Sequence, residues 1–379
     1  MHPRGGDAPR RATRLLIAAV AVGAVGLVVA GLVTAAKAIQ PASRPSFQAG
    51  AFAGSVSGKP SAVPTRPRPA ARITLAFAGD VHFEGRVAAR LAADPASTLG
   101  PIASTLTRAD LAMVNLETAV TERGVREPKP FTFRAPPTAL TALKAAGIDV
   151  ATMANNHGAD FGRTGLEDSL AAISAVRFPT VGIGRDAAAA YKPYYREVRG
   201  HRVAILGASQ IRDRTLAAWT AGVSSPGIAS AYSQRLVSAV RAARARAEVV
   251  VVYVHWGVEG QRCPSDEQRA LAARLSEAGA DAVVGTHAHL LLGGGFLGRT
   301  YIGYGLGNFL WWRDGAFSND TGVLELTFRG RRVVAAKLSP ARIDSTGAPI
   351  PATGATADRI RTAFEDLRGC TGLSAEPPA

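Results

Sequence analysis

From residue 72 onward, short apolar runs alternate with segments whose apolar residues recur at helical spacing. The runs predicted to form strands are residues 73–78, 110–115, 149–153, 203–206, 248–254, 281–284, 301–304, 322–328 and 332–338. The segments predicted to form helices are residues 138–146, 164–176, 232–247 and 266–278. This alternation predicts a layered α/β domain, and the unbroken apolar run at 248–254 predicts a strand that is covered on both faces.

An uncharged apolar run of 22 residues occupies positions 15–36. As a helix it would be about 33 Å long, which is enough to cross a hydrocarbon core of about 30 Å. The basic leader, residues 1–14, would stay in the cytoplasm, so we predict a single-pass membrane anchor with the rest of the chain outside the cell. The alternative is a secreted protein with a cleaved signal peptide, because Ala36-Lys37-Ala38 resembles a small-x-small cleavage site.

The rest of the chain divides into three predicted parts. Residues 37–71 are rich in Pro, Ser and Ala and have no hydrophobic period, so they are predicted to be a linker. Residues 72–345 are predicted to form the main domain. Residues 346–379 are predicted to form a C-terminal helix and tail.

Composition and charge exclude several classes of protein. The 379 residues are 47% hydrophobic and 19% charged, which is typical of a chain with a buried core and unlike collagen or a coiled coil. The formal net charge is +15, of which residues 1–72 contribute +9, so nucleic acid is not a predicted partner. The two cysteines, Cys263 and Cys370, cannot form a C-x-x-C zinc or redox site. An external location permits a disulfide between them, and two separate thiols remain an equal alternative.

Polar side chains follow most of the predicted strands directly. They are Asp80 and His82, Asn115 and Glu117, Asn155 with Asn156 and His157, His255, and His287 with His289. Taken singly, each cluster has an ordinary interpretation, since Asp80 would cap a helix and Asn155-Asn156 would form a turn. Ligands of open α/β sheets, however, bind beyond the carboxyl ends of the strands. Together these imidazole, carboxylate and carboxamide donors suit Mn, Fe or Zn and outnumber the ligands of one tetrahedral zinc, so two divalent metal ions are predicted.

The order of these motifs resembles the calcineurin-like metallophosphoesterase superfamily. The particular residues within the motifs resemble a narrower group, the bacterial capsule synthesis protein CapA family, which is associated with poly-γ-glutamate. The motifs that carry the resemblance are Gly79-Asp80, Asn115-Leu116-Glu117, Ala154-Asn155-Asn156-His157 with Asp160, Gly162 and Gly165 behind it, His255-Trp256-Gly257-x-Glu259, Gly279-Ala280-Asp281, His287-x-His289, and Gly305-Leu306-Gly307-Asn308-Phe309. They span residues 72–312 in unbroken order.

The resemblance implies a metallophosphoesterase-like α-β-β-α sandwich behind the transmembrane helix, and it implies roles for individual residues. The implied metal ligands are Asp80, His82, Glu117, Asn156, His255, His287 and His289. The implied catalytic residues are Asn155, His157 and Glu259, of which His157 faces the substrate without binding metal. Asn115 and Asn308 are implied to orient ligands or to contact substrate.

Two features depart from the family pattern. Many members lack a histidine at the position of His82, so its role as a ligand rests on the wider superfamily. Residues 290–298, LLLGGGFLG, form an apolar, glycine-rich stretch where a polar loop is expected, which leaves the substrate contacts of that loop open.

These observations favour an anchored, extracytoplasmic, metal-dependent hydrolase of capsule or poly-γ-glutamate biosynthesis, acting on a phosphoester or an envelope polymer bond. The alternative is a component that binds the polymer without hydrolysis within an assembly or export complex. The predicted partners are the membrane, through the N-terminal helix, an anionic polymer and other capsule-synthesis proteins. No Gly-x-Ser-x-Gly elbow or Walker A motif occurs in the sequence, which disfavours a serine hydrolase or a P-loop NTPase.

Overall fold

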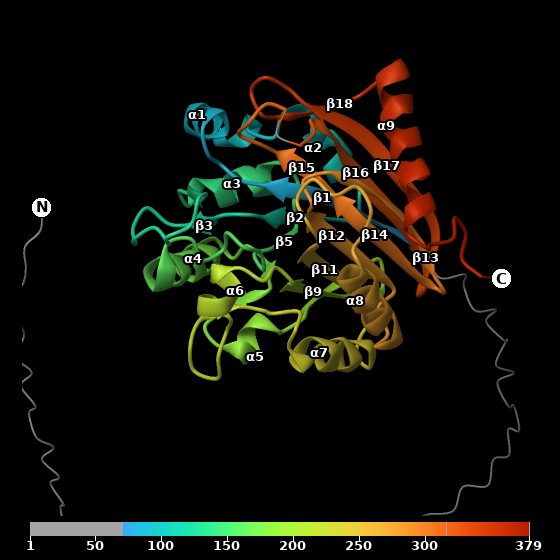
Figure 1. The fold of residues 1–379 in the computed structure, drawn as a ribbon, viewed down its shortest axis with the longest axis horizontal. Helices are drawn as coiled ribbons and strands as arrows, with labels where there is room; N and C mark the ends of the chain where they lie inside the picture. Colours follow the sequence, from blue (N-terminus) through green and yellow to red (C-terminus); the bar gives the residue numbers. More distant parts are fainter. Residues whose placement is uncertain (1–70, 316, 379) are drawn as a thin grey trace, which may run out of the picture. The chain divides into compact units, whose positions relative to one another are not determined.

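The computed structural model describes residues 71–315 and 317–378 (Figure 1). The predicted leader 1–14, the anchor 15–36 and all but the last residue of the linker 37–71 lie outside the described residues. Among the helices that are described, none has the length and apolarity needed to cross a membrane.

One large mixed sheet is built around β1, a strand predicted from the first apolar run. Along the sheet the strands follow the order β18 (Pro349–Pro351), β17 (Arg332–Ile343), β16 (Asp320–Arg329), β1 (Arg72–Val81), β2 (Leu111–Leu116), β5 (Val150–Thr152) and β6 (Thr180–Val181), and β15 (Asn308–Leu310) also pairs with β1. From β1 to β6 the pairs are parallel, whereas β16, β17 and β18 add antiparallel strands on the other side. The carboxyl ends of β1, β2 and β5 therefore lie at one edge of this sheet.

A second mixed sheet has β11 near its centre. Its strands follow the order β13 (Leu291–Leu297), β14 (Thr300–Leu306), β12 (Ala282–His287), β11 (Val249–Trp256), β9 (His201–Ser209) and β8 (Tyr194–Val198). Pairing of β11 with both β9 and β12 is parallel. Two small pairs complete the strands, β3 (Ala119–Val120) with β4 (Arg134–Ala135) and β7 (Ile183–Gly184) with β10 (Gly227–Ile228).

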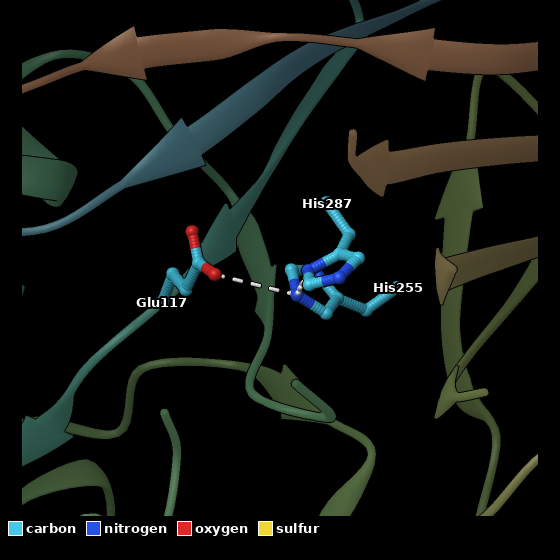
Figure 2. Close-up of side chains that lie close together, drawn as sticks. All are labelled: Glu117, His255 and His287. Carbon is cyan, nitrogen blue, oxygen red and sulfur yellow. Dashed lines mark hydrogen bonds and ion pairs between the residues drawn. The ribbon is translucent and has the colours of Figure 1, made fainter. Parts of the chain in front are cut away.

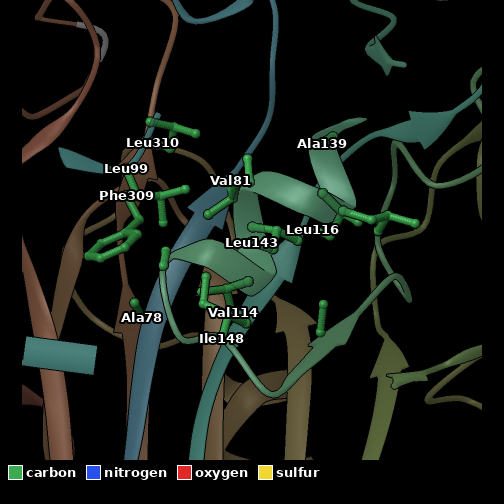
Figure 3. Close-up of a cluster of buried hydrophobic side chains, with 14 of the residues drawn as sticks. Ala78, Val81, Leu99, Val114, Leu116, Ala139, Leu143, Ile148, Phe309 and Leu310 are labelled. Carbon is green, nitrogen blue, oxygen red and sulfur yellow. The ribbon is translucent and has the colours of Figure 1, made fainter. Parts of the chain in front are cut away.

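Helices cover the outer faces of the two sheets (Figure 1). The α-helices are α1 (Arg86–Ala93), α2 (Ala103–Thr107), α3 (Thr138–Ala145), α4 (Gly162–Val176), α5 (Ala187–Ala190), α6 (Arg214–Trp219), α7 (Gln234–Arg244), α8 (Asp266–Glu277) and α9 (Gly354–Asp366). One apolar cluster joins α1 to α4 to the first sheet, with Val81, Val114, Leu143 and Phe309 among its members (Figure 3). A second cluster joins α7 and α8 to the second sheet.

The two sheets pack face to face through a third apolar cluster. Period-2 alternation along β1 explains how one strand serves both layers, because successive side chains point to opposite faces. Leu75 and Phe77 belong to the cluster between the sheets, whereas Ala76 and Ala78 belong to the cluster under the helices. The layer order is therefore helix, sheet, sheet, helix, as predicted from the motifs.

The C-terminal segment packs as part of the same unit. The helix predicted within residues 346–379 is present as α9, which contacts β13 and β17, and β18 pairs with β17. Cys263 and Cys370 form a disulfide across 107 residues of sequence, so of the two alternatives the paired state is the one found.

Residues 290–298, expected to be a loop, hold the edge strand β13. Glycine is required here by close packing, because a Cβ on Gly293 would lie 2.5 Å from the Arg368 nitrogen and one on Gly295 would lie 2.5 Å from the Ser374 oxygen. The chain after α9 crosses this strand so closely that side chains are excluded at these two positions. An apolar, glycine-rich stretch where the resemblance implied a polar loop is therefore a strand under a covering segment.

Candidate metal centre

The carboxyl ends of strands from both sheets bring the predicted polar residues together. In the first sheet, Asp80 on β1 is in register with Asn115 on β2 and with Asn308 on β15. In the second sheet, β11 ends in His255-Trp256 and β12 ends in His287. Parallel pairing places these strand ends side by side, as the sequence predicted.

Close approach of two backbones shapes the end of β1. A Cβ on Gly79 would lie 1.9 Å from the carbonyl oxygen of Gly307, and the Asp80 N–H donates a hydrogen bond of 2.9 Å to that same oxygen. A glycine is the residue that permits this contact, because it has no side chain to collide. The Gly79-Asp80 motif thus fixes the position of the Asp80 carboxylate.

Asp80 is fully buried and is held by neighbours from both sheets. Asn115 Nδ2 donates to its Oδ1 at 2.7 Å, and His289 Nδ1 lies 3.3 Å from its Oδ2. Burial opposes ionisation, but the hydrogen bond from His289 and the neighbouring His255 bring the pKa of Asp80 below its ordinary value. The Asp80 carboxylate is therefore an anionic donor inside the protein.

Glu117, just after β2, carries the least satisfied carboxylate among the described residues. Both of its oxygens are buried without a hydrogen-bond partner, and His255 Nε2 approaches Oε1 to 3.3 Å without hydrogen-bond geometry (Figure 2). Burial, reinforced by the charges of Asp80 and Glu259, raises the pKa of Glu117 well above its ordinary value. Buried carboxylates are normally hydrogen-bonded, ion-paired or bound to metal, so this one lacks its partner.

Three nitrogen and oxygen atoms that could bind a metal surround Nε2 of the His255 ring. Nε2 lies 2.7 Å from Asn156 Oδ1, 3.0 Å from His287 Nδ1 and 3.3 Å from Glu117 Oε1. Two imidazole nitrogens at this separation cannot both carry a proton. Burial lowers the pKa of His255 to about 3 and that of His287 well below its ordinary value, so both rings are neutral and offer lone pairs.

The backbone carrying His287 and His289 is strained. Their φ angles are +94° and +57°, in a region that residues with side chains seldom adopt. Such strain persists only where surrounding structure enforces it, and it concentrates at functional sites. Here it turns both imidazoles toward the carboxylates, with His289 Nδ1 also 2.8 Å from Asn308 Oδ1.

The donor geometry fits metal binding. Two groups of closely spaced donors share Glu117: one is Glu117, His255 and His287, and the other is Asp80, Glu117 and His289. Donors bound to one ion at about 2.0–2.1 Å lie about 3.0–3.4 Å apart. The distances from His255 Nε2 to His287 Nδ1, 3.0 Å, and to Glu117 Oε1, 3.3 Å, fall in this range.

Glu259 joins a third group with His287 and His289, but unlike them it is exposed. It lies on the loop after β11, at the rim of a cleft that is also lined by His157 and His289. The resemblance implied a catalytic role for Glu259, and the structure places its carboxylate where it faces both solvent and the donors.

A charged pair lies behind His157, the residue implied to face substrate. Asp160 Oδ2 is 2.6 Å from His157 Nδ1, and its Oδ1 is 2.5 Å from Lys129 Nζ. Burial raises the pKa of Asp160 to about 7 despite Lys129, and burial lowers the pKa of His157 well below its ordinary value. The pair therefore fixes the imidazole and holds an exchangeable proton near neutral pH.

Asn155 and Asn115 form the frame between these groups. Asn155 Nδ2 donates to Asn115 Oδ1 at 2.9 Å, and Asn155 Oδ1 accepts from the His157 N–H at 3.0 Å. The amide of Asn155 is thus used within the protein, where it positions His157. Asn156 differs, because its side-chain oxygen is directed at His255.

Among the predicted histidine and carboxylate ligands, His82 is the one that the structure does not bring into these groups, within the part of the chain that it describes. Its Nδ1 accepts from the Glu84 N–H at 3.2 Å, and its Nε2 lies 3.4 Å from the Trp312 nitrogen. The ring stacks on Phe133 with centroids 4.5 Å apart. Burial holds the pKa of His82 well below its ordinary value, so the ring is neutral and accepts at one nitrogen only. The two N–H contacts are therefore not both hydrogen bonds, and the ligand role of His82 stays a prediction.

Sequence reasoning missed the aromatic residues around this centre. Phe133 stacks on His157 at 4.1 Å, and Trp311 lies 4.7 Å from the His289 ring. A signal for them exists in the segments Phe131-Thr132-Phe133 and Trp311-Trp312, since aromatic residues make up only 6% of the chain. It went unused because the segments contain no ionisable group.

Comparison with known proteins agrees with the motifs. The family model described as "Bacterial capsule synthesis protein PGA_cap" matches residues 74–311, and the chain belongs to this family. It is 31% identical over 213 residues to the "PGA biosynthesis protein CapA" of Bacillus subtilis, covering 56% of this chain and 55% of the relative. It is 32% identical over 220 residues to the "Capsule biosynthesis protein CapA" of Bacillus anthracis, covering 57% and 53%. The chain thus spans about half the length of the curated relatives it matches.

Among solved structures, a phosphatase from Mycoplasma pneumoniae is similar with a TM-score of 0.47 at 13% identity, covering 72% of this chain and 94% of that one. A likeness of this extent says nothing about the activity of the present chain.

Proposed function

We propose that this protein is a metal-dependent hydrolase of phosphoesters that acts outside the cell in capsule or poly-γ-glutamate biosynthesis. The observation that carries the proposal is the buried carboxylate of Glu117, which has no hydrogen-bond partner and belongs to two overlapping groups of donors. A fold maintains such a group when a cation compensates for it. Two groups sharing one carboxylate suit two divalent ions.

The residues that would hold these ions come from both sheets. They are Asp80, Glu117, Asn156, His255, His287 and His289. This mixture of oxygen and nitrogen donors suits Mn, Fe or Zn. When bound, the ions would supply a polarised phosphoryl group and a nucleophilic water at neutral pH.

The protein's own groups would do the rest of the work. Oxygen from water forms a bond to phosphorus while the bond from phosphorus to the leaving oxygen breaks. His157 gives a proton to the leaving oxygen, and the hydrogen-bonded pair of His157 and Asp160 regains a proton from the attacking water, so the pair ends as it began. Asp160 orients His157 through its Nδ1 at 2.6 Å, and Lys129 balances the charge of Asp160. A positioned acid or base of this kind contributes about 10²–10⁴-fold to rate.

Location outside the cell is part of the proposal. Residues 15–36 would anchor the chain in the membrane, with signal cleavage and secretion as the alternative. The Cys263–Cys370 disulfide supports this location, because disulfides persist in oxidising compartments. The membrane, an anionic polymer and other capsule-synthesis proteins are the proposed partners.

Two histidine substitutions in the full chain test the proposal. His289→Ala should lose bound metal, measured by elemental analysis, together with hydrolysis of an aryl phosphate. His157→Ala should keep its metal and lose about 10²–10⁴-fold in rate, because this ring moves a proton and binds no ion. The matched control is His201→Ala, a buried histidine that pairs with Glu248 at the opposite ends of β9 and β11.

The outcomes separate the possible roles. If the wild-type chain purifies without metal and gains no activity when Mn, Fe or Zn is added, the hydrolase proposal fails and a polymer-binding role in assembly is favoured. If His157→Ala loses metal as completely as His289→Ala, the role of His157 is wrong. The His201 variant should match the wild type in both measurements.

A further inference from the structure

A narrow cleft leads from the surface to His157 and His289. Its other walls are mainly aromatic, formed by Phe131, Phe133, Trp311, Trp312 and Phe317, and Arg313 and Glu259 also line it. The cleft encloses about 110 Å³. Pockets that hold a whole drug-sized ligand enclose about 300–1,000 Å³, so only the reacting end of a larger substrate enters this cleft.

The aromatic walls extend from the candidate centre out to solvent. Deep inside, Phe133 stacks on His157 with centroids 4.1 Å apart. At the surface, Phe131 is 52% exposed, and its ring lies 6.5 Å from that of Trp312. Large aromatic side chains exposed at a cleft mark a binding surface rather than a core. The part of the substrate outside the cleft therefore meets apolar ring faces.

The charge of the cleft does not suit a polyanion. Of its described lining residues, Arg313 is the one permanent cation, and the carboxylate of Glu259 opposes it. Recognition of a run of carboxylates or phosphates calls for several lysines or arginines in complementary positions. A γ-glutamyl chain with a negative charge on every residue is thus a poor match for this entrance.

The ring geometry does not suit a nucleobase either. A base held between two rings needs those rings parallel with a gap between them. The Phe131 and Trp312 planes meet at 65° and the Phe133 and Trp312 planes at 66°. The near-parallel pairs, Phe133 with His157 and His289 with Phe317, already stack on each other at 4.1 Å and 5.4 Å and leave no room for a base between them. A sugar ring needs only one aromatic platform at a time. Its face of C–H bonds packs on the electron-rich face of an aromatic ring, and its hydroxyls bond to polar groups at the rim.

One polar group in the wall has no hydrogen-bond partner among the described residues. The indole N–H of Trp311 is buried and unpaired, although the residue lines the cleft and is only 4% exposed. Buried indole N–H groups usually have an acceptor. Because protein atoms cover that N–H, the polar side chains at the rim that can meet a polyhydroxylated ligand are Arg313, a donor, and Glu259, an acceptor.

We propose that the cleft binds a sugar phosphate, with the sugar ring against Trp312 and Phe131 and the phosphate directed toward His157 and His289. This inference rests on the proposed function, because it names the substrate class of the same site. The bond hydrolysed would then be the phosphoester of a carbohydrate, and the acidic polymer would not be the molecule that enters.

Calorimetric titration of the full chain, with and without Mn²⁺, tests the proposal. The probes are glucose 1-phosphate, glycerol 3-phosphate, inorganic phosphate, AMP and a short γ-glutamyl oligomer. Glucose 1-phosphate should bind about tenfold more tightly than glycerol 3-phosphate, since both carry a phosphate monoester but only one carries a ring. AMP and the oligomer should bind more weakly than glucose 1-phosphate.

Variants assign this preference to the walls. Trp312→Ala should bring the glucose 1-phosphate to glycerol 3-phosphate ratio close to one and leave the affinity for inorganic phosphate unchanged, and Trp312→Phe should restore part of the ratio. Arg313→Ala should weaken all phosphates alike. Tyr232→Ala is the matched control, because Tyr232 is a partly exposed aromatic residue that pairs with Arg212 and Glu267 and does not line the cleft.

Three results would overturn the inference: equal binding of glycerol 3-phosphate, tighter binding of AMP or the oligomer, or an equal loss for both phosphates in Trp312→Ala. Its failure is distinguishable from failure of the proposed function. A metal-loaded chain that hydrolyses an aryl phosphate but does not prefer glucose 1-phosphate would contradict only the assignment of a sugar phosphate. A chain without metal or activity that still prefers glucose 1-phosphate would contradict only the proposal that the protein is a hydrolase.

Discussion

The middle and the end of β1 are equally buried and differ in chemistry. Leu75 and Phe77, in the middle of the strand, fill the space between the sheets. Each such side chain contributes about 1.5–3 kcal/mol when it is removed from water. Asp80, near the end of the same strand, is just as buried but carries a charge.

The second sheet repeats this contrast. Val251 and Tyr253 on β11 belong to the core between the sheets, and His255, two residues further on the same face, belongs to the candidate centre. The strained backbone at His287 and His289 is a further unfavourable feature of this edge of the sheet. The lesson is that the apolar middle of the strands stabilises the fold enough to hold their polar ends in an unfavourable arrangement.

The largest expected effect comes from a substitution in the apolar middle of β1. Phe77→Ala should lower the free energy of unfolding by about 3–5 kcal/mol, because it removes a fully buried ring and leaves a cavity between two sheets. Urea denaturation followed by circular dichroism measures the loss. Val125→Ala is the matched control, since Val125 is 84% exposed and its change should stay within about 0.5 kcal/mol. A loss below 1 kcal/mol for Phe77→Ala would contradict a packed core between the sheets.

A covalent link adds to the contacts that hold the rim of the cleft. The disulfide from Cys263 to Cys370 ties the segment after β11, which carries Glu259, to the residues after α9. Replacing both cysteines by serine should lower the free energy of unfolding by about 2–4 kcal/mol, because the unfolded chain loses a long loop constraint. Denaturation with and without reductant measures it.

The double variant should respond to reductant no further, which controls for effects of the reagent. If the wild type under reductant keeps its full stability, the link contributes nothing, and the rim would then depend on packing like the core.

The sequence predicted the parts of this contrast that depend on local pattern. Continuous apolar runs such as 248–254 predicted buried strands, and polar residues after them predicted which edge carries the site. The structure brings five of the predicted ligands close together: Asp80, Glu117, His255, His287 and His289. These predictions succeeded because strand period and parallel pairing are regular.

The remaining features depend on contacts between distant segments. The resemblance implied a loop at the glycine-rich stretch 290–298, which is a strand. Nothing in the local sequence shows that Arg368 and Ser374 cross over it. The ligand role of His82 rested on resemblance to the wider superfamily, and the sequence could not show that its ring stacks on Phe133, a residue distant along the chain. A short stretch of sequence predicts where a strand ends and which way its side chains alternate. It does not predict which distant segment crosses a strand or how a ring is oriented.

The smallest expected effect has the opposite sign and sharpens the comparison. In the presence of EDTA, Glu117→Met should raise the free energy of unfolding by about 1–3 kcal/mol, because it replaces a buried unpaired carboxyl with an apolar side chain of similar length. Urea denaturation of the metal-free variant and wild type measures the gain. The same variant should lose metal binding.

The pH dependence of this gain identifies its cause. Folding raises the pKa of Glu117 above its ordinary value of 4.5, so above that pH the unfolded chain releases a proton that the folded state retains. Stability of the metal-free wild type then falls as pH rises through this range, and the advantage of Glu117→Met should grow between pH 4 and pH 7. Glu117→Gln, which keeps the polar group but cannot ionise, should also escape the fall while gaining less at pH 4. A Met variant less stable than the wild type at every pH would mean that the Glu117 carboxyl has a partner within the protein. The contrast between the apolar middle of the strands and their polar ends would then no longer hold.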